Sequence, residues 1–403
     1  MKALVVTTAP PDATTAKQTG STNWTLRLLR LLDQHHEITL LAPPPLDEPY
    51  LQQAHFTQLE CPPDNRFGTC NRFLKSFLCK VYPSMWHQRS SKIDDFLAHT
   101  SRREFDVCWL LDDYAGMYLK QIPIDLPVVF CRHFVLNMGL PERAANPTFT
   151  SWIKLRWHKY LARSFDRWTT LRSNVVITGT KESRKNLLAL EPKGEVVYFP
   201  TKPCHTPKST PIEKIEKSTR QDGRITAIFL GDMTFPRNVD AINWLTEKVL
   251  PLLAPQEQAA FHFKFIGRYS HCDSAIVPPG DLSLEYTGFV EDLHEHLSHA
   301  QCAAIPVFGG NGVRVKTVTL LGSGLPTVST SDGVEGLPVV SGKDLIIADT
   351  PESFAEGLRT LLSPDKRLLL AKKCRDTMGQ FLSEENDSEK LFSISRETCK
   401  KRE

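Results

Sequence analysis

The part of this 403-residue chain that most constrains its fold is an alternation of apolar runs and glycine-rich turns at 303–337. An apolar run of strand length at 303–308 leads into Gly309, Gly310 and Gly312, and a helical pattern follows over 313–321. A second apolar run, 326–329, leads into Gly333 and Gly336. This order of strand, turn, helix and strand is typical of a parallel α/β sheet. The sequence therefore predicts an α/β protein.

The first glycine turn is also a candidate anion site. Glycines let the backbone bend sharply and let a ligand approach it closely. The turn leads into a helix N-terminus, where free N–H groups and the helix dipole attract anions, above all phosphates. Arg314 and Lys316 place two positive charges in that first turn, which the dipole disfavours unless an anion lies between them. The alternative is an ordinary glycine turn with surface cations.

The N-terminal part has the same alternation of strand and helix. The pattern predicts a buried strand at 2–8, an amphipathic helix at 24–32 and a second strand at 36–41, as in a Rossmann-like domain. The first turn has no G-x-G-x-x-G sequence, so a nicotinamide dinucleotide is disfavoured. A further strand at 126–130 is followed by His133, and ligands of open α/β sheets bind just beyond such strand ends. His133 is therefore a candidate for chemistry, although a structural turn histidine is the alternative.

The second half restarts the pattern with a strand at 224–230, a helix at 238–253 and a strand at 261–266. Between the halves, 200–220 is rich in proline, lysine and serine, which is typical of a linker. The predicted organisation is a first domain at 1–200, a linker at 201–222, a second domain at 223–382 and a C-terminal helix at 383–403.

Composition limits the partners and the compartment. The net charge of +3 is too small to favour nucleic acid as a partner. The ten cysteines contain no C-x-x-C pair, which is typical of reduced thiols in the cytoplasm. The acids and histidines at 291–296 begin a helix, where acids favour the dipole, so no metal site is predicted there. No apolar run reaches the roughly 18 to 20 residues that span a bilayer.

Two basic and aromatic segments, 66–92 and 152–171, allow a peripheral contact with a membrane. Burial of one helix face against the sheet is the default for both. We therefore expect a cytoplasmic protein, either free or peripheral on the inner face of the membrane.

The region 303–337 resembles the C-terminal half of GT4-type glycosyltransferases of the GT-B fold, also called group 1 glycosyl transferases. Many members of that family carry a G-x-G-x-R-x-K loop, then G-x-P-V-V-S-T and G-x-E-G-L. The matching residues here are Gly310, Gly312, Arg314, Lys316, Gly324, Pro326, Val328, Ser329, Thr330, Gly333, Glu335, Gly336 and Leu337.

The resemblance implies two Rossmann-like domains facing a cleft, with the C-terminal helix crossing back to the N-terminal domain. It implies a UDP-sugar or GDP-sugar donor on the C-terminal side, no bound cofactor, and a glycan, lipid-linked or protein acceptor on the N-terminal side. Transfer in this family retains the anomeric configuration and needs no bound metal. By register, the catalytic residues would be His133, Arg314 and Lys316. Donor contacts would come from Gly20, Gly231, Gly310, Asn311, Gly312, Val313, Thr319 and Glu335.

Two positions depart from the family. Its paired glutamates, one of which holds the donor ribose, fall on Asn311 and Thr319. A threonine hydroxyl cannot accept two hydrogen bonds in the bidentate way that a carboxylate does. Two alternatives to an active transferase therefore stay open: a catalytically impaired homologue that acts as a partner or scaffold in glycan assembly, and a sugar-nucleotide epimerase of the same fold.

Overall fold

A computed structural model of the chain describes residues 1–9, 20–44, 46, 50–51, 56–64, 83–101, 103–133, 149–217, 220–268, 283–309, 312–383 and 385–400. The chain forms two compact units. Unit 1 comprises Met1–Cys204 and Glu384–Glu403, and unit 2 comprises His205–Ser383.

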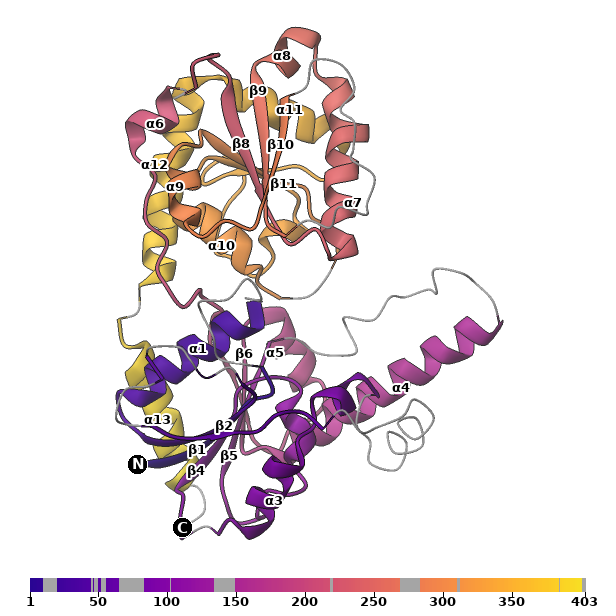
Figure 1. Cartoon of the computed structure of the whole chain (residues 1–403), viewed down its shortest axis with the longest axis vertical. Helices are drawn as coiled ribbons and strands as arrows, with labels where there is room; N and C mark the ends of the chain where they lie inside the picture. The colour runs from indigo at the N-terminus through magenta and orange to yellow at the C-terminus, as the bar shows by residue number, and fades with distance from the viewer. Residues whose placement is uncertain are drawn as a thin grey trace. The chain divides into compact units, whose positions relative to one another are not determined.

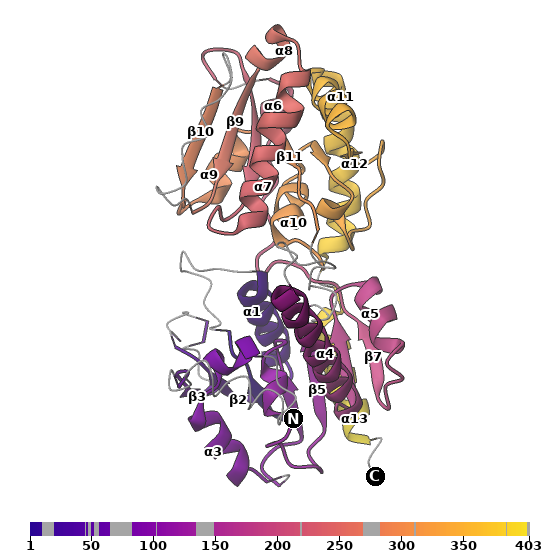
Figure 2. The ribbon, with the colours of Figure 1, turned by 90° about the vertical axis from the view of Figure 1, so that its right-hand side faces the viewer.

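Unit 1 is built on seven parallel strands in the order β3-β2-β1-β4-β5-β6-β7 (Figures 1 and 2). The strands are β1 (Lys2–Val6), β2 (Glu37–Ala42), β3 (Phe56–Glu60), β4 (Val107–Leu110), β5 (Val128–Arg132), β6 (Val175–Thr178) and β7 (Glu195–Tyr198). The helices are α1 (Gly20–Asp33), α3 (Ser91–His99), α4 (Phe149–Arg172), α5 (Lys181–Leu188) and α13 (Asp387–Lys400), with short 3-10 helices at Pro83–Gln88 and Ala115–Tyr118. The central strands β1, β4, β5 and β6 are buried along nearly their whole length, because helices cover both faces of a parallel sheet.

The C-terminal helix α13 belongs to unit 1 and lies beside α1 (Figure 1). Its first residue, Asp387, accepts hydrogen bonds from the buried Arg27, at 2.5 Å, and from Lys202, at 2.7 Å. Near its other end the hydroxyl of Ser395 is 2.9 Å from the Nε2 of His36. These contacts confirm the predicted return of the C-terminal helix to the N-terminal part of the chain.

Unit 2 holds six parallel strands in the order β10-β9-β8-β11-β12-β13. The strands are β8 (Ile225–Leu230), β9 (Phe261–Ile266), β10 (Ser283–Gly288), β11 (Cys302–Ile305), β12 (Thr327–Ser329) and β13 (Ile346–Ile347). The helices are α6 (Ile212–Glu216), α7 (Pro236–Trp244), α8 (Pro255–Ala259), α9 (Leu293–Ser298), α10 (Val315–Gly322), α11 (Pro351–Leu362) and α12 (Pro364–Leu382). In Figure 1, α7 and α12 lie on opposite sides of this sheet.

Both sheets are doubly wound, which confirms the prediction of two Rossmann-like folds. The strand order reverses between β1 and β4 in unit 1, and between β8 and β11 in unit 2. Ligands of open α/β sheets bind beyond the carboxyl ends of the strands at such a point. The residues that follow β8 and β11 are therefore the first place in unit 2 to look for a site.

The predicted helix at 238–253 is continuous only as far as Trp244. A π-helical turn, Leu245–Val249, and a 3-10 turn, Leu250–Leu252, replace its second half. Pro251 explains the break, because proline has no N–H to donate and clashes with the preceding helical turn.

The segment at 201–222, which its composition indicated as a linker, contains a helix packed into unit 2. This helix, α6, is held by the guanidinium of Arg367, which is 2% exposed. Arg367 donates to the carbonyl oxygens of Ile215 and Glu216 on one side and of Leu361 and Leu362 on the other, at 2.6 to 3.0 Å. Proline and lysine content did not reveal this docking because its partner lies some 150 residues further along the chain.

We expect Arg367→Met to destabilise unit 2 by about 2 to 4 kcal/mol, because four carbonyl groups lose a charged donor in a buried site. The measurement is chemical unfolding, together with amide hydrogen exchange at 212–216, which should speed up. Lys366→Met at the exposed neighbouring position is the control and should change stability by less than about 0.5 kcal/mol. Equal stability of the two variants would contradict the conclusion that Arg367 holds α6 against unit 2.

Candidate functional site

The turn between β11 and α10 is fixed by glycines and by one carboxylate. Gly309 and Gly312 have φ angles of 63° and 91°, in the left-handed region that side chains disfavour. The N–H of Gly309 donates to Asp332 at 2.7 Å, and its carbonyl accepts from the guanidinium of Arg314 at 2.6 Å. The turn after β12 therefore holds the turn after β11. Gly310 and Asn311, both predicted to contact the donor, lie outside the described residues.

Arg314 is the residue directly before α10, because the helix begins at Val315 and not at 313 as expected. Its Nε is buried and has no hydrogen-bond partner among the described residues. Burial lowers the pKa of Arg314, although the carboxylates of Glu335 and Asp332 act in the opposite direction. An arginine stays charged at any physiological pH, so a half-buried positive charge with an unused donor lies at the start of this helix.

Lys316 lies in the first turn of α10 and is half-buried. Its Nζ donates to the Oδ1 of Asn238 at 2.6 Å and is 4.8 Å from the ring centroid of Phe229. Burial, and then the charge of Arg314, lower the pKa of Lys316 to about 7. Neither Lys316 nor Arg314 forms an ion pair with any residue that the structure describes. Two basic side chains at a helix N-terminus, neither in an ion pair with a described residue, favour the binding of an anion.

The turn after β8, which begins with Gly231, lies close to Lys316. Gly231 donates its N–H to Ile266 at 2.9 Å, and a Cβ at this position would lie 3.1 Å from the side chain of Asn238. Asn238 also donates to the carbonyl of Asp232 at 2.7 Å, which orients its oxygen toward Lys316. The structure therefore brings Gly231 and Lys316 together through Asn238, which the sequence analysis did not single out as a site residue.

The other described residues of unit 2 that were predicted to contact the donor do not share hydrogen bonds with Asn238 or Lys316. The hydroxyl of Thr319 donates to the carbonyl of Val315 at 3.0 Å, within the helix. Glu335 follows the short turn Asp332–Val334 and acts on Arg314 by its charge. Gly312 is buried, and Val313 packs against the apolar cluster under α10.

In unit 1, His133 directly follows β5. Its main-chain N–H donates to the Oδ2 of Asp113 at 3.1 Å, and its ring meets that of Trp24 edge to face at 4.4 Å. Burial lowers the pKa of His133 to about 4, although Asp112 and a hydrogen bond to Leu111 act against it. The imidazole is therefore neutral at pH 7. Gly20 is the first residue of α1, and the turn before it lies outside the described residues.

Two consecutive aspartates that the sequence analysis did not consider organise this end of unit 1. Asp112 accepts hydrogen bonds from the residues after β1 and from its own turn: Thr7, Thr8, Tyr114 and Ala115. Asp113 is 3.5 Å from the buried Arg132, which also pairs with Asp166. Burial raises the pKa of Asp113 to about 7 against the effect of Arg132. Adjacent acids directly after a buried strand were the available sequence signal.

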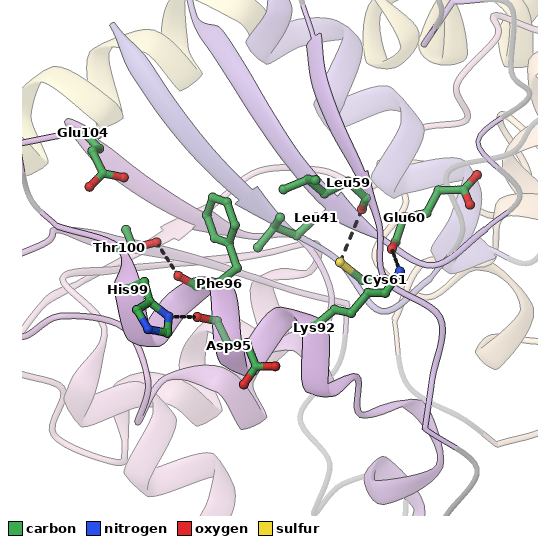
Figure 3. A pocket seen from close by; sticks show the side chains of 10 residues that line it. All are labelled: Leu41, Leu59, Glu60, Cys61, Lys92, Asp95, Phe96, His99, Thr100 and Glu104. Atoms are coloured by element: carbon green, nitrogen blue, oxygen red, sulfur yellow. Dashed lines mark hydrogen bonds between the residues drawn. The ribbon is translucent and has the colours of Figure 1, made fainter.

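A separate cavity of about 460 Å³ lies in unit 1 beside β2, β3 and α3 (Figure 3). Leu41, Leu59, Cys61 and Phe96 form its apolar lining. Its rim holds Glu60, Asp95 and Glu104 but only one lysine, Lys92. A rim with net negative charge does not suit a phosphate.

The acid-rich segment at 291–296 begins α9, as predicted: Asp292 accepts from the N–H of Glu295 at 3.2 Å. In the described part of the chain, no three histidine, cysteine or acidic residues gather as metal ligands would. None of the described helices is long and apolar enough to cross a membrane.

Comparison with solved structures identifies the class of fold. Sucrose-phosphate synthase from Thermosynechococcus elongatus superimposes with a TM-score of 0.67 at 11% sequence identity, over 98% of each chain. Anabaena Alr3699/HepE in complex with UDP superimposes with a TM-score of 0.58 at 13% identity, over 98% of this chain and 99% of that one. At these identities the likeness shows the fold, and the fold is GT-B.

Residues 224–364 match the family model of the group 1 glycosyl transferases, which confirms the predicted resemblance. An uncharacterized 44.6 kDa protein in the cps region of Klebsiella pneumoniae is 25% identical over 199 residues. That alignment covers 47% of this chain and 49% of the relative, about half the length of each. The matched family consists of transferases and does not support the epimerase alternative.

The low pKa of Lys316 predicts how the stability of the protein without a bound anion depends on pH. An unfolded lysine has a pKa of 10.5, so unfolding takes up a proton between about pH 7 and pH 10, and the folded state loses stability as the pH falls through that range. Lys316→Met should therefore stabilise the free protein by about 1 kcal/mol at pH 7 and by less at pH 10.

The measurement is the thermal midpoint of both proteins at pH 7 and pH 10. Lys248→Met, an exposed lysine after α7, is the control and should show no such pH dependence. A Lys316 variant whose stability relative to the native chain does not change with pH would contradict the assigned pKa.

Proposed function

We propose that this protein is a glycosyltransferase that moves a sugar from a UDP-sugar or GDP-sugar to a glycan, lipid-linked or protein acceptor. One observation carries the proposal: Arg314 and Lys316 are half-buried at the start of α10 without an ion-pair partner in the described chain. A diphosphate supplies the missing negative charge. The family match over 224–364 and the neighbour bound to UDP support a nucleotide-sugar as the source of that diphosphate.

The chemistry follows from the charge that develops on the leaving group. As the bond between sugar and diphosphate breaks, negative charge accumulates on the diphosphate oxygens, and fixed donors that face it lower the barrier. Arg314, Lys316 and the N–H groups of Gly312 and Val313 are the donors proposed for this role. They supply the charge that a bound metal would otherwise provide, so the proposed transfer is metal-independent and, as in the resembled family, retaining.

Unit 2 is the proposed donor domain and unit 1 the proposed acceptor domain. In unit 1, the neutral His133 is fixed by Asp113 and Trp24 at the end of β5. A neutral imidazole donates or accepts a hydrogen bond without a charge of its own. We assign His133 the role of a hydrogen-bond partner of the transferred sugar. We propose that Gly20, Gly231, Thr319 and Glu335 contact the donor.

Thr319 supports a second candidate function, a homologue that binds partners in glycan assembly without catalysis. Its hydroxyl donates a hydrogen bond to the carbonyl of Val315 within α10, so its proton is already used inside the helix. A ligand there would meet a single weak acceptor where the family has a carboxylate. Nucleotide binding distinguishes the two candidates, because the site of a transferase must bind its leaving group.

We expect the native chain to bind UDP, and Arg314→Gln to bind it at least tenfold more weakly, since a hydrogen bond to a charged group contributes about 1.5 to 3 kcal/mol. Calorimetric titration with UDP and with GDP measures this and identifies the base. Arg359→Gln, which removes an arginine on α11 that pairs with Glu257, is the control and should bind UDP like the native chain. If the native chain binds neither nucleotide, the scaffold function is favoured and the transferase is not.

The proposal extends to a peripheral contact with an anionic membrane through α4. One exposed face of this helix carries, at successive turns, Trp152, Arg156, Tyr160, Arg163 and Arg167. Trp152 is 51% and Tyr160 57% exposed, and the guanidinium of Arg156 is 4.9 Å from the ring centroid of Trp152. The one acid of the helix, Asp166, is buried in its pair with Arg132. Aromatic rings among cations, without acids, suit the interface of an anionic bilayer. The other basic segment, 66–92, lies largely outside the described residues.

We expect the protein to sediment with vesicles that contain phosphatidylglycerol. The double variant Arg156→Gln, Arg167→Gln should bind them about thirtyfold more weakly, because each cation near such a surface contributes about 1 kcal/mol. Lys181→Gln, Lys185→Gln on the exposed face of α5 is the matched control and should bind like the native chain. Equal loss in both double variants would show a non-specific charge effect and would exclude α4 as the docking surface.

A further inference from the structure

The side chain of Asn238 connects Lys316 to the turn after β8. Its Oδ1 accepts a hydrogen bond from the Nζ of Lys316 at 2.6 Å, and its Nδ2 donates to the main-chain carbonyl of Asp232 at 2.7 Å. A carbonyl oxygen only accepts, so Lys316 donates in this contact whether or not its amine is charged. The bond to Asp232 fixes which end of the amide faces the lysine. Asn238 therefore presents an acceptor to Lys316 in a defined orientation.

The turn that holds Asn238 has hydrogen bonds of its own. The Oδ1 of Asp232 accepts from the N–H of Thr234 at 3.0 Å and from its hydroxyl at 2.6 Å, and the Oδ2 of Asp232 pairs with Arg268, which follows β9. The main chain at Gly231 passes so close that a Cβ there would lie 3.1 Å from the Cγ of Asn238. The position of the amide is therefore determined by contacts that do not involve Lys316.

The acid in this turn does not compensate the charge of Lys316. Burial opposes the ionisation of Asp232, but the hydrogen bonds from Thr234 and the pairing with Arg268 lower its pKa, so its carboxylate is charged and already paired. Among the described residues, the charge that acts on the pKa of Lys316 is that of Arg314, and no carboxylate contributes. On this side Lys316 meets a neutral amide and the ring of Phe229, whose centroid is 4.8 Å away. These two groups orient the amine without neutralising its charge.

We propose that Asn238 is a positioning residue of the donor site: it directs the amine of Lys316 toward the diphosphate and, being uncharged, leaves the positive charge of Lys316 to that diphosphate. This inference rests on the proposed function, because it assigns a role to one more residue of the same site. Aspartate has nearly the same shape as asparagine, but at this position it would form an ion pair with Lys316 and repel the diphosphate. An amide is therefore the side chain that orients the lysine and keeps it available.

The protonation of Lys316 provides a readout that is specific to this contact. Burial, and then the charge of Arg314, lower the pKa of Lys316 to about 7, so most of the free protein has a neutral amine there at pH 8. A bound diphosphate favours the charged form, so UDP binding at pH 8 should take up about one proton. A terminal phosphate, with a second pKa of about 6, is already ionised at that pH.

The other charged groups around Lys316 do not take up this proton. They come from α7, from the turns after β8, β9 and β12, and from the residue before α10: Arg237, Asp232, Arg268, Asp332, Glu335 and Arg314. Carboxylates and guanidinium groups ordinarily keep their charge between pH 7 and 9. Uptake of a proton near pH 8 therefore reports on the lysine.

The test is calorimetric titration of the full chain at pH 8 with UDP or GDP, whichever the native chain binds, in two buffers of different ionisation enthalpy. Asn238→Asp should bind the nucleotide at least about tenfold more weakly and take up almost no proton, because Lys316 is already charged in the ion pair. Asn238→Leu removes the acceptor without adding a charge, so it should weaken binding about three- to tenfold and keep the proton uptake. Asn243→Asp, at a half-buried position further along α7, is the matched control and should behave like the native chain.

A double-mutant cycle with Lys316→Met distinguishes positioning from a merely structural role. If Asn238 acts through Lys316, Asn238→Leu should change the affinity of the Lys316→Met chain by less than about twofold. The thermal midpoint of each variant shows whether it is folded.

Two outcomes would overturn this inference and leave the proposed function intact. One is equal weakening by Asn238→Leu with and without Lys316, which would show that the residue only supports the fold. The other is native affinity and native proton uptake in Asn238→Asp. Failure of the proposed function would instead appear as a native chain that binds neither UDP nor GDP, and the inference would then fail with it.

Discussion

The central constraint in this structure is the desolvation of two cations at the N-terminus of α10. Burial disfavours the charged form of a lysine, and the neighbouring arginine disfavours it further. The pKa of Lys316 accordingly falls to about 7. The strand order of unit 2 brings Asn238, Phe229 and the turn after β12 around these cations but supplies no ion-pair partner from the described chain. Their burial makes the free protein less stable, and the anion proposed to bind here would restore that stability.

At the carboxyl end of its strands, unit 1 differs from unit 2 in how its buried charges are paired. Its buried charges are compensated internally: Arg132 lies between Asp113 and Asp166, and Asp112 is saturated by hydrogen bonds from two turns. Buried pairs of this kind fix geometry more than they add stability. His133, directly after β5, is neutral at pH 7 and contacts Asp113 and Trp24. Unit 2 therefore offers basic side chains without an ion pair among the described residues, and unit 1 a neutral imidazole in a defined position. This difference agrees with the proposed division into donor and acceptor domains.

Much of the fold could be predicted because buried parallel strands are continuous apolar runs. Strands β1, β8, β9 and β11 lie where the runs at 2–8, 224–230, 261–266 and 303–308 indicated, to within a few residues. Composition and periodicity missed details in two places, where a distant partner or a single residue decides the local structure. The linker at 201–222 contains α6 because Arg367 holds it, and the helix after 238 is interrupted ahead of Pro251. In both places local composition was outweighed by a contact or by one residue.

The sequence by itself determined which residue types stand at the turn after β11, and hence that an anion site is possible there. Glycine spacing and helix polarity are local properties, so no tertiary information was required. The tertiary structure alone decided that Asn238 binds Lys316, that the hydroxyl of Thr319 is used within its own helix, and that Asp112 and Asp113 hold the turns of unit 1. Most of these partners lie far apart in the sequence, and burial sets their charge states. The pattern of side chains along the sequence shows neither which of these residues contact one another nor how deeply they are buried.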